Sequence, residues 1–256
     1  MNDFGVLLKK YYFYFLLLLL AVTFFLRNNC RNVQEIAPEV LHEPVQSELN
    51  NTSLIRFSRN DYSYELTPVY AYEISGLIAS KMDYQAFSIE KFDKVFPMDL
   101  CMIWGSNVAN GVYKNREVVF SQDCRWCTVW VRQAGISFNY NEISNSHLLI
   151  SDPVLEKKAK SLVVGDQVKI IGKLVNVKAN LTGKPGSFDS PYYSLKTSTE
   201  RTDKGAGACE VIYVEDIEIL KKANVIADFL FHATLYGLLI LIIWNILRFF
   251  NIIKLE

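Results

Sequence analysis

Hydrophobic residues form two long uncharged stretches near the ends of the chain and short alternating runs between them. The stretches run from Tyr11 to Leu26 and from Phe229 to Leu247, and a charged residue stands at each of their ends. A spanning helix needs about 20 apolar residues. The second stretch reaches that length, and the first approaches it if its tyrosines and flanking basic side chains lie at headgroup level. We therefore predict transmembrane helices at 11–27 and 228–247, with tails at 1–10 and 248–256.

The first stretch has the order of an export signal, basic residues followed by an apolar run, but no small-residue cleavage pattern follows it. We interpret it as an uncleaved signal anchor. Two spans place both tails on one side of the membrane, and the flanking basic residues are balanced between the two sides. The export-like first helix therefore decides the orientation. We expect an inner (cytoplasmic) membrane protein with both tails in the cytoplasm and the domain outside, as in a bacterial envelope.

Ala233 and Gly237 stand four residues apart in the second stretch. Small residues at that spacing let helix backbones approach closely within lipid. We expect a packing surface there, whose partner is the first helix, a second copy of the chain or another membrane subunit.

Residues 28–66 contain prolines, a polar run and glutamates at four-residue intervals, Glu35, Glu39 and Glu43. Like charges at that spacing oppose a helix. We predict an extended stalk, which either holds the domain away from the bilayer or lies along the surface of its own domain.

Residues 67–221 show mostly the patterns of strands, so we expect one mainly β domain of α+β type. Apolar or alternating runs predict strands near 70–78, 100–104, 118–120, 128–131, 167–177 and 210–220. Helices are predicted within 80–96 and 153–161, where apolar residues recur at helical spacing or a proline opens the segment.

The run that begins at Gly165-Asp166 changes its hydrophobic phase at Gly172. Val168 and Ile170 share one face before this glycine, and Val175 and Val177 share the other face after it. A strand that bends across a small barrel needs such a change. The run resembles the long curved strand of an OB-fold barrel, and 210–220 resembles its closing strand. The resemblance implies a small OB-like barrel with one or two helices, a scaffold that takes nucleic acid, sugar or protein ligands.

Charge and composition limit the possible partners. The chain has 27 basic and 27 acidic residues, and 50% of its residues are hydrophobic. This excludes a disordered protein and gives no overall attraction to nucleic acid. A local basic excess does lie between 155 and 185, in Lys157, Lys158, Lys160, Lys169, Lys173, Lys178 and Lys184. It leaves OB-type nucleic-acid binding as an alternative, although lysines on a barrel surface need no ligand.

Four cysteines lie in the expected domain, Cys101, Cys124, Cys127 and Cys209. In an oxidising compartment they favour two disulfides, and sequence alone leaves three possible pairings open. Cys124 and Cys127 also match the redox-active Cys-x-x-Cys spacing, but they lead into a strand instead of opening a helix. Buried free thiols are a further alternative. A zinc site would need a second such pair or more histidines, so we expect no metal and no cofactor.

Two further features are candidates for a site. His147 has serines nearby and Asp152 five residues on, but no ordered triad or nucleophile motif, so we expect a structural histidine. The segment 179–209 is a long loop rich in glycine and proline, which is either functional or simply solvated. Its binding candidates are Arg201, Asp203 and Lys204.

These patterns predict a membrane-anchored, non-catalytic binding or assembly module that presents an OB-like domain to a protein or envelope partner. No catalytic residue is assigned. The expected partners are the lipid bilayer and a protein partner or second copy that packs on the second membrane helix; nucleic acid is disfavoured. The main alternative is an envelope thiol-disulfide oxidoreductase that uses Cys124 and Cys127.

Overall fold

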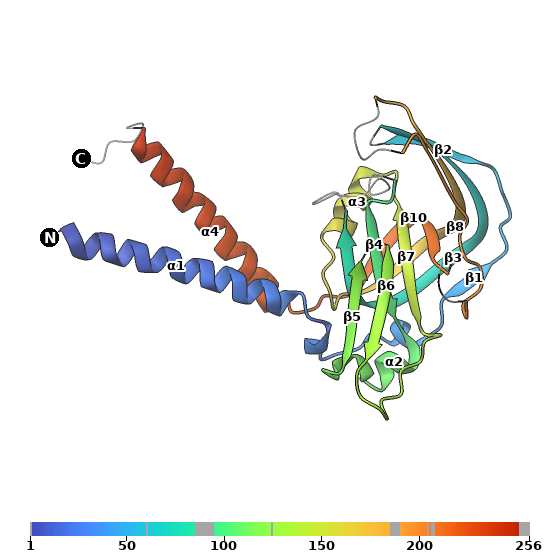
Figure 1. Cartoon of the computed structure of the whole chain (residues 1–256), viewed down its shortest axis with the longest axis horizontal. Coiled ribbons are helices and arrows are strands. Elements are labelled where there is room, and N and C mark those ends of the chain that lie inside the picture. The colour runs from blue at the N-terminus through green and yellow to red at the C-terminus, as the bar shows by residue number, and fades with distance from the viewer. Residues whose placement is uncertain are drawn as a thin grey trace.

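The computed structural model describes residues 2–59, 61–84, 95–123, 125–184, 190–203, 205 and 208–250. It shows a β-rich domain from which two long helices leave on the same side (Figure 1). These are α1 (Asn2–Arg27) and α4 (Val225–Phe249). The prediction of a mainly β molecule is confirmed.

Five strands of the main sheet pair in a closed circuit. They are β3 (Tyr62–Asp83), β4 (Met98–Ile103), β7 (Ile143–Leu149), β10 (Glu210–Lys221) and β8 (Gln167–Leu181). The order is β3-β4-β7-β10-β8, and β8 pairs with β3 again. Only the pairing of β7 with β10 is parallel among these five contacts. The predicted helix near 153–161 is confirmed as α3 (Pro153–Lys160), which connects β7 to β8.

Further strands extend or cover this circuit. β1 (Val45–Ser47) and β2 (Ile55–Arg59) pair with β3, and β9 (Tyr192–Leu195) pairs with β8. β3 and β8, with 22 and 15 residues, are the longest described strands, and they continue past the circuit as a curved arm together with β2 and β9 (Figure 1). β5 (Val118–Asp123) and β6 (Trp126–Val131) form a separate hairpin after the short helix α2 (Gly105–Ala109).

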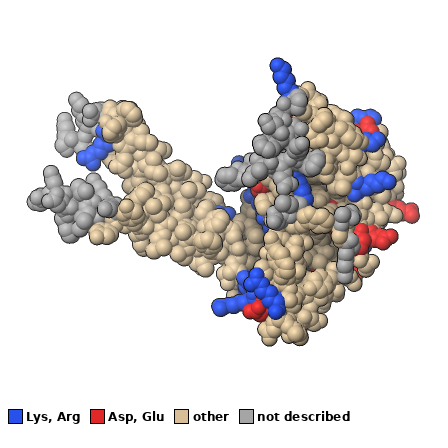
Figure 2. Space-filling view, viewed as in Figure 1, with Lys and Arg blue, Asp and Glu red and all other residues tan. Residues whose placement is uncertain are grey.

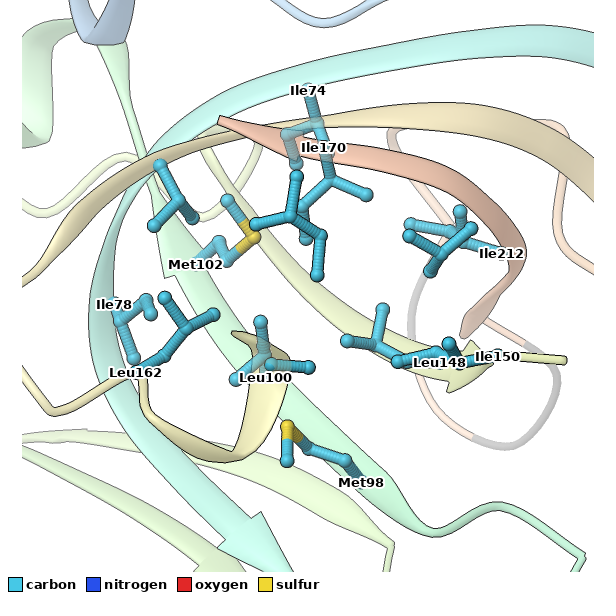
Figure 3. Packing of buried hydrophobic residues seen from close by; sticks show 14 of the residues in the cluster. Ile74, Ile78, Met98, Leu100, Met102, Leu148, Ile150, Leu162, Ile170 and Ile212 are labelled. Carbon is cyan, nitrogen blue, oxygen red and sulfur yellow. The ribbon is translucent and has the colours of Figure 1, made fainter. Parts of the chain in front are cut away.

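The interior of the circuit is filled by alternate residues of its strands (Figure 3). Leu100 and Met102 come from β4, Leu148 from β7, Ile170 from β8 and Ile212 from β10, and all are fully buried. Side chains of a strand point alternately to its two faces, so this spacing leaves the residues between them for the outer face.

Gly172 allows β8 and β10 to approach closely. A Cβ atom at this position would lie 2.1 Å from the backbone oxygen of Tyr213. The register of the two strands also shifts nearby, between Val214 and Asp216. No side chain can be accommodated here, which explains why a glycine interrupts the apolar run.

The expected stalk is packed against its own domain, the second of the two arrangements considered for residues 28–66. It contains the 3₁₀ turns η1 (Cys30–Asn32) and η2 (Pro38–Leu41) and then β1 and β2. Val33, Ala37 and Val40 are buried against Leu77 and Ile103. The side chain of Gln167 bonds the backbone on both sides, accepting from Ala37 N at 2.7 Å and donating to Glu35 O at 2.7 Å.

The helix expected in part of 80–96 is not seen in the described residues of that range. Ser80 to Asp83 continue β3, and they pair with β4. Residues 85–94 lie outside the described part of the chain. β3 extends through Ser80 because its ladder partners on β4 continue alongside it.

Among the described residues, α4 is the one helix long and apolar enough to cross a membrane, whereas the apolar section of α1, Tyr11–Arg27, is shorter. The two helices pack together, and Thr23 of α1 and Thr234 and Leu238 of α4 are buried. Figure 2 shows the paired helices as a surface that is largely free of charged side chains between the domain and their far ends.

The small residues of α4 lie away from this contact. Ala233 is exposed, and a Cβ atom added to Gly237 would meet no described atom within 4 Å. Of the partners considered for this surface, α1 therefore does not occupy it, and a second copy or another subunit remains.

Candidate functional site

The ladder between β4 and β7 places polar residues on its outer face. Asp99 lies opposite His147, and Cys101 lies opposite Asn145. Because these positions alternate with the core residues Leu100 and Leu148, the four side chains share the face that points away from the interior.

The hairpin of β5 and β6 covers this polar face (Figure 1). A disulfide joins Cys101 on β4 to Cys127 on β6. Gln122 on β5 donates from Nε2 to Asn145 Oδ1 at 2.8 Å. Arg125, in the turn between the two strands, has a left-handed backbone with φ of 70°. These contacts hold the hairpin turn against β7.

Asp99 is fully buried, with 0% of its side chain exposed, and it is held by three side chains. Its carboxylate lies 2.8 Å from His147 Nδ1, and it accepts from the hydroxyl of Tyr84 at 2.9 Å and from Arg125 Nη1 at 3.3 Å. The guanidinium of Arg125 also lies 3.8 Å from the centre of the Tyr84 ring. A buried carboxylate is costly unless it is paired in this way.

The environment of His147 favours its charged form. Burial acts to lower the pKa of the imidazole, but the charge of Asp99 and hydrogen bonds to Asp99 and Cys209 outweigh it and raise the pKa to about 9. The ring is therefore an imidazolium at neutral pH, with its orientation fixed by Asp99. The expectation of a structural histidine did not anticipate this partner, since it considered Asp152.

Cys209 lies directly before β10 and carries a free thiol in the described structure. The side chain of His147 hydrogen-bonds it. Because Nδ1 of His147 faces Asp99, Nε2 is the nitrogen available to the thiol. Asn145 Nδ2 lies 3.3 Å from the sulfur and also donates to Arg125 O at 2.6 Å. The imidazole of His147 thus lies between the carboxylate of Asp99 and the thiol of Cys209.

Cys209 lies at the wall of a cavity of about 220 Å³. The cavity lies between the β5–β6 hairpin, the starts of β7 and β10, and the segment before Cys209. Its lining is partly aromatic and apolar and partly charged, and it includes Trp126, Cys127, Val129, Tyr140, Ile143, Ser144, Asn145, Arg201, Asp203, Cys209 and Glu210.

Glu210 is a second buried acid in the cavity wall. Its carboxylate accepts from Ser144 Oγ at 2.9 Å, and Ser144 in turn lies 2.7 Å from Ser146 Oγ. Burial raises the pKa of Glu210 to about 7, against the hydrogen bond from Ser144 and the charge of Arg201. This carboxyl is therefore partly protonated near neutral pH.

Two of the three loop candidates line the cavity. Arg201 donates from Nη2 to Pro44 O at 3.2 Å, and Asp203 accepts from Ser198 Oγ at 2.5 Å. Lys204 lies outside the described residues. The structure therefore brings Arg201 and Asp203 together with Glu210, although the sequence indicated only a shared loop.

The cysteines are arranged differently from the redox alternative. Cys127 bonds to Cys101, so it is not paired with Cys124, which lies outside the described residues. The first of the expected disulfides is present. A second one, between Cys124 and Cys209, stays a prediction, and the thiol of Cys209 is free in this structure.

Three lysines of the basic segment are paired with acids. Lys160 pairs with Glu156 at 2.8 Å, Lys169 pairs with Glu73 at 3.2 Å, and Lys173 pairs with Glu215. These lysines are spread over α3 and β8, and their charges are locally compensated.

A larger cavity of about 770 Å³ lies elsewhere, where the two long helices meet the domain. Its lining includes Leu26, Val33, Ile226 and Leu230. The charged side chains that line it are Glu35, Lys221 and Lys222. Because it opens beside apolar helices, we assign no chemistry to it.

Asp99, Asn145, Arg125 and Glu210 were not singled out from the sequence. The usable signal was Asp99 itself, a carboxylate inside the apolar run Met98 to Ile103. A charge within a buried strand requires a partner. Comparison of the chain with protein-family models, curated proteins and solved structures gives no match.

Proposed function

We propose that the chain is a membrane-anchored binding module whose barrel is of the OB type. The five-stranded closed circuit supports this proposal, because OB-folds are five-stranded Greek-key barrels. In such barrels the ligand lies on the face of the second and third strands and on the loops beside it. Here those strands are β4 and β7.

The position of the cavity is the observation that carries the proposed function. The cavity lies at the start of β7, and the connection between the fourth and fifth strands of the circuit, 182–209, supplies Arg201 and Asp203. Trp126 and Tyr140 are exposed at its rim. Exposed aromatic residues beside charged groups are typical of protein-binding surfaces. The site therefore suits a protein or envelope partner.

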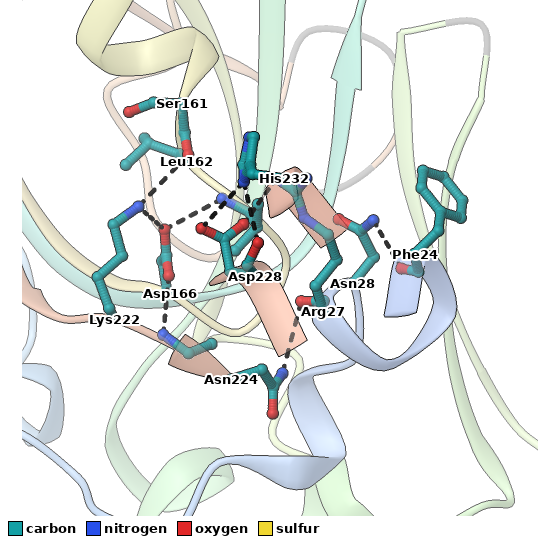
Figure 4. A network of polar contacts seen from close by, with 12 residues as sticks. Phe24, Arg27, Asn28, Ser161, Leu162, Asp166, Lys222, Asn224, Asp228 and His232 are labelled. Atoms are coloured by element: carbon teal, nitrogen blue, oxygen red, sulfur yellow. Dashed lines mark hydrogen bonds and ion pairs between the residues drawn. The ribbon is translucent and has the colours of Figure 1, made fainter. Parts of the chain in front are cut away.

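The junction with the helices supports a presenting role (Figure 4). Asp166 accepts from Ala223 N at 2.8 Å and from Lys222 Nζ at 2.8 Å, next to the start of α4. Asn224 donates to Asn29 O at 3.1 Å, which joins the ends of α4 and α1 that adjoin the domain. We call this junction the helix root. Arg27 pairs with Asp228 at 3.0 Å. A barrel held in this way keeps one orientation toward the bilayer.

A site-specific photocrosslinker tests the binding surface. Placed at Trp126 in the full-length protein in its native membrane, it should give a discrete crosslinked product that Arg201→Ala weakens. The same group at exposed Val154, on α3, is the matched control. Equal crosslinking from both positions, or none from Trp126, would contradict a binding site at this cavity.

The proposal includes spanning by both long helices, with the domain outside the cytoplasm. Cys30 is a poor reporter of this topology, because its thiol is buried and burial raises its pKa to about 11. Val154→Cys provides an exposed thiol instead. It should react with an impermeant maleimide in intact cells, whereas reaction only after lysis would reverse the orientation.

We also propose that the Ala233 and Gly237 surface of α4 contacts a second copy or another subunit. Gly237→Ile would place a branched side chain where the backbone of α4 approaches that of its partner. It should lower crosslinking between full-length chains in the membrane several-fold. Tyr236→Ile adds the same residue next to this surface and should have less effect. Unchanged assembly of Gly237→Ile would leave α4 as an anchor only.

A further inference from the structure

Three groups from separate strands form the arrangement that thiol nucleophiles use. A cysteine sulfur lies beside an imidazole, and the imidazole is oriented by a buried carboxylate at 2.8 Å. Nucleophilic sites combine a nucleophile, a base and a group that orients the base. Asp99 comes from β4, His147 from β7 and Cys209 from the start of β10, and the strand registers set their order.

A structural role alone accounts for the His147–Asp99 pair but not for the thiol at the cavity wall. Cys209 is half-buried and lines the 220 Å³ cavity, so a small molecule can reach its sulfur. Asn145 holds an amide N–H 3.3 Å from that sulfur. Gln122 and the backbone of Arg125 fix this amide, which leaves one donor beside the place where charge would develop during attack.

We propose that Cys209 is a nucleophile, supported by His147 and Asp99, that accepts a short acyl group from an activated ester or thioester in the cavity. This goes beyond the proposed binding function, although it uses the same cavity. Attack uses the neutral imidazole, which forms as the pH rises toward the pKa of His147 of about 9. Nε2 of this imidazole takes the thiol proton, and the sulfur attacks the acyl carbon. The sulfur–carbon bond forms, the bond to the leaving alcohol or thiol breaks, and His147 returns the proton to that leaving group.

The lining selects the acyl group. Val129, Ile143 and Trp126 give the cavity an apolar side, and its volume is below the roughly 300 Å³ typical of drug-sized ligands. Arg201 and Asp203 also line the cavity and provide charged groups for a polar leaving group. A short apolar acyl chain fits this lining.

The test uses full-length protein in detergent micelles with p-nitrophenyl acetate as the probe. We expect a burst of p-nitrophenol of about one equivalent per chain and an acetyl group on the Cys209 peptide that hydroxylamine removes. Cys209→Ser should abolish the burst. Asn145→Ala should slow acylation by about tenfold or more, since a single oxyanion donor contributes up to about 10²–10³ in rate. His147→Asn should slow acylation further.

If His147→Asn does not fold, the parent protein still decides the question. Acetylation of Cys209 in the folded chain should be at least tenfold faster than in the urea-unfolded chain at the same pH. Equal rates would overturn the proposal. The intact mass of the unreduced protein is a second test. A disulfide between Cys124 and Cys209 would mean that Cys209 has a structural role and no free thiol, which would overturn the proposal. Failure here leaves Trp126 crosslinking unaffected, so the two proposals can fail separately.

Discussion

Two aspartates have 0% exposed side chains, and their neighbours differ in kind. Asp166, next to the helix root, accepts from the backbone N–H groups of Val163 at 3.1 Å and Ala223 at 2.8 Å, and from Lys222. Asp99, on β4, is held by the side chains of His147, Tyr84 and Arg125. The first therefore fixes where chain segments meet, whereas the second fixes how the side chain of His147 points.

Burial alone does not distinguish a structural acid from a functional one. Both carboxylates are paired with cations, as buried charges must be. The difference lies in what each cationic partner contacts next. His147 contacts the thiol of Cys209 at a cavity, whereas 38% of the side chain of Lys222 is exposed to solvent. The following predictions test whether this difference is real.

The largest expected effect is on stability, at Asp166. Asp166→Ala leaves two buried N–H groups without an acceptor, which should lower the free energy of unfolding by about 3–5 kcal/mol. Asp152→Ala is the matched control, since Asp152 accepts from Val154 N at 2.8 Å as an exposed helix cap, and it should cost about 1 kcal/mol. Urea denaturation of full-length protein measures both. Similar losses of unfolding free energy in the two variants would show that Asp166 does not stabilise the junction between the domain and α4.

Strands whose apolar residues alternate or run together could be predicted from the sequence, whereas β7, in which four polar residues stand in a row, could not. The runs near 167–177 and 210–220 correspond to β8 and β10, because their inward residues are aliphatic. β7 was missed because Ser144, Asn145, Ser146 and His147 interrupt any apolar period. Its place between β4 and β10 depends on partners distant in sequence.

The site was predictable only in its separate parts. Four cysteines and the loop residues Arg201 and Asp203 were visible, but the link from Asp99 through His147 to Cys209 results from two strand registers. Sequence spacing does not encode register. The pairing of Cys101 with Cys127 depends likewise on how the hairpin folds over β4.

The next effect is on pH dependence, at the Asp99 site. The pKa of His147 is raised from 6.5 to about 9 on folding. The extra proton that the folded state binds therefore adds to the free energy of unfolding in full below pH 6.5, and this stabilisation is lost as pH rises through about 9. The loss should reach about 3 kcal/mol at most. The groups that face His147 are Asp99, Arg125 close to Asp99, and Cys209. Unfolding free energy measured from pH 6 to 9.5 should fall accordingly.

Two variants separate the sources of this slope. His147→Asn should remove the fall between pH 6.5 and 9. Glu210→Gln should instead remove a fall at lower pH, because the pKa of Glu210 is raised from 4.5 to about 7 and its favourable protonation is lost as pH rises through that range. A slope that persists in His147→Asn would mean that the Asp99 site does not bind the extra proton.

The smallest effect is expected at Asp228, which lies in the same root as Asp166 but is partly exposed. Its pair with Arg27 has side chains that are 35% and 13% exposed, and exposed or half-exposed ion pairs contribute at most about 1 kcal/mol. Asp228→Asn should therefore lower the free energy of unfolding by less than about 1 kcal/mol, with a loss that shrinks as salt increases. It should also leave acetylation of Cys209 unchanged, since the root and the cavity are held by separate contacts. A loss as large as that of Asp166→Ala would show that the whole root unfolds as one unit. A change in Cys209 reactivity would show that the two buried aspartates belong to one coupled network, which would remove the distinction between them.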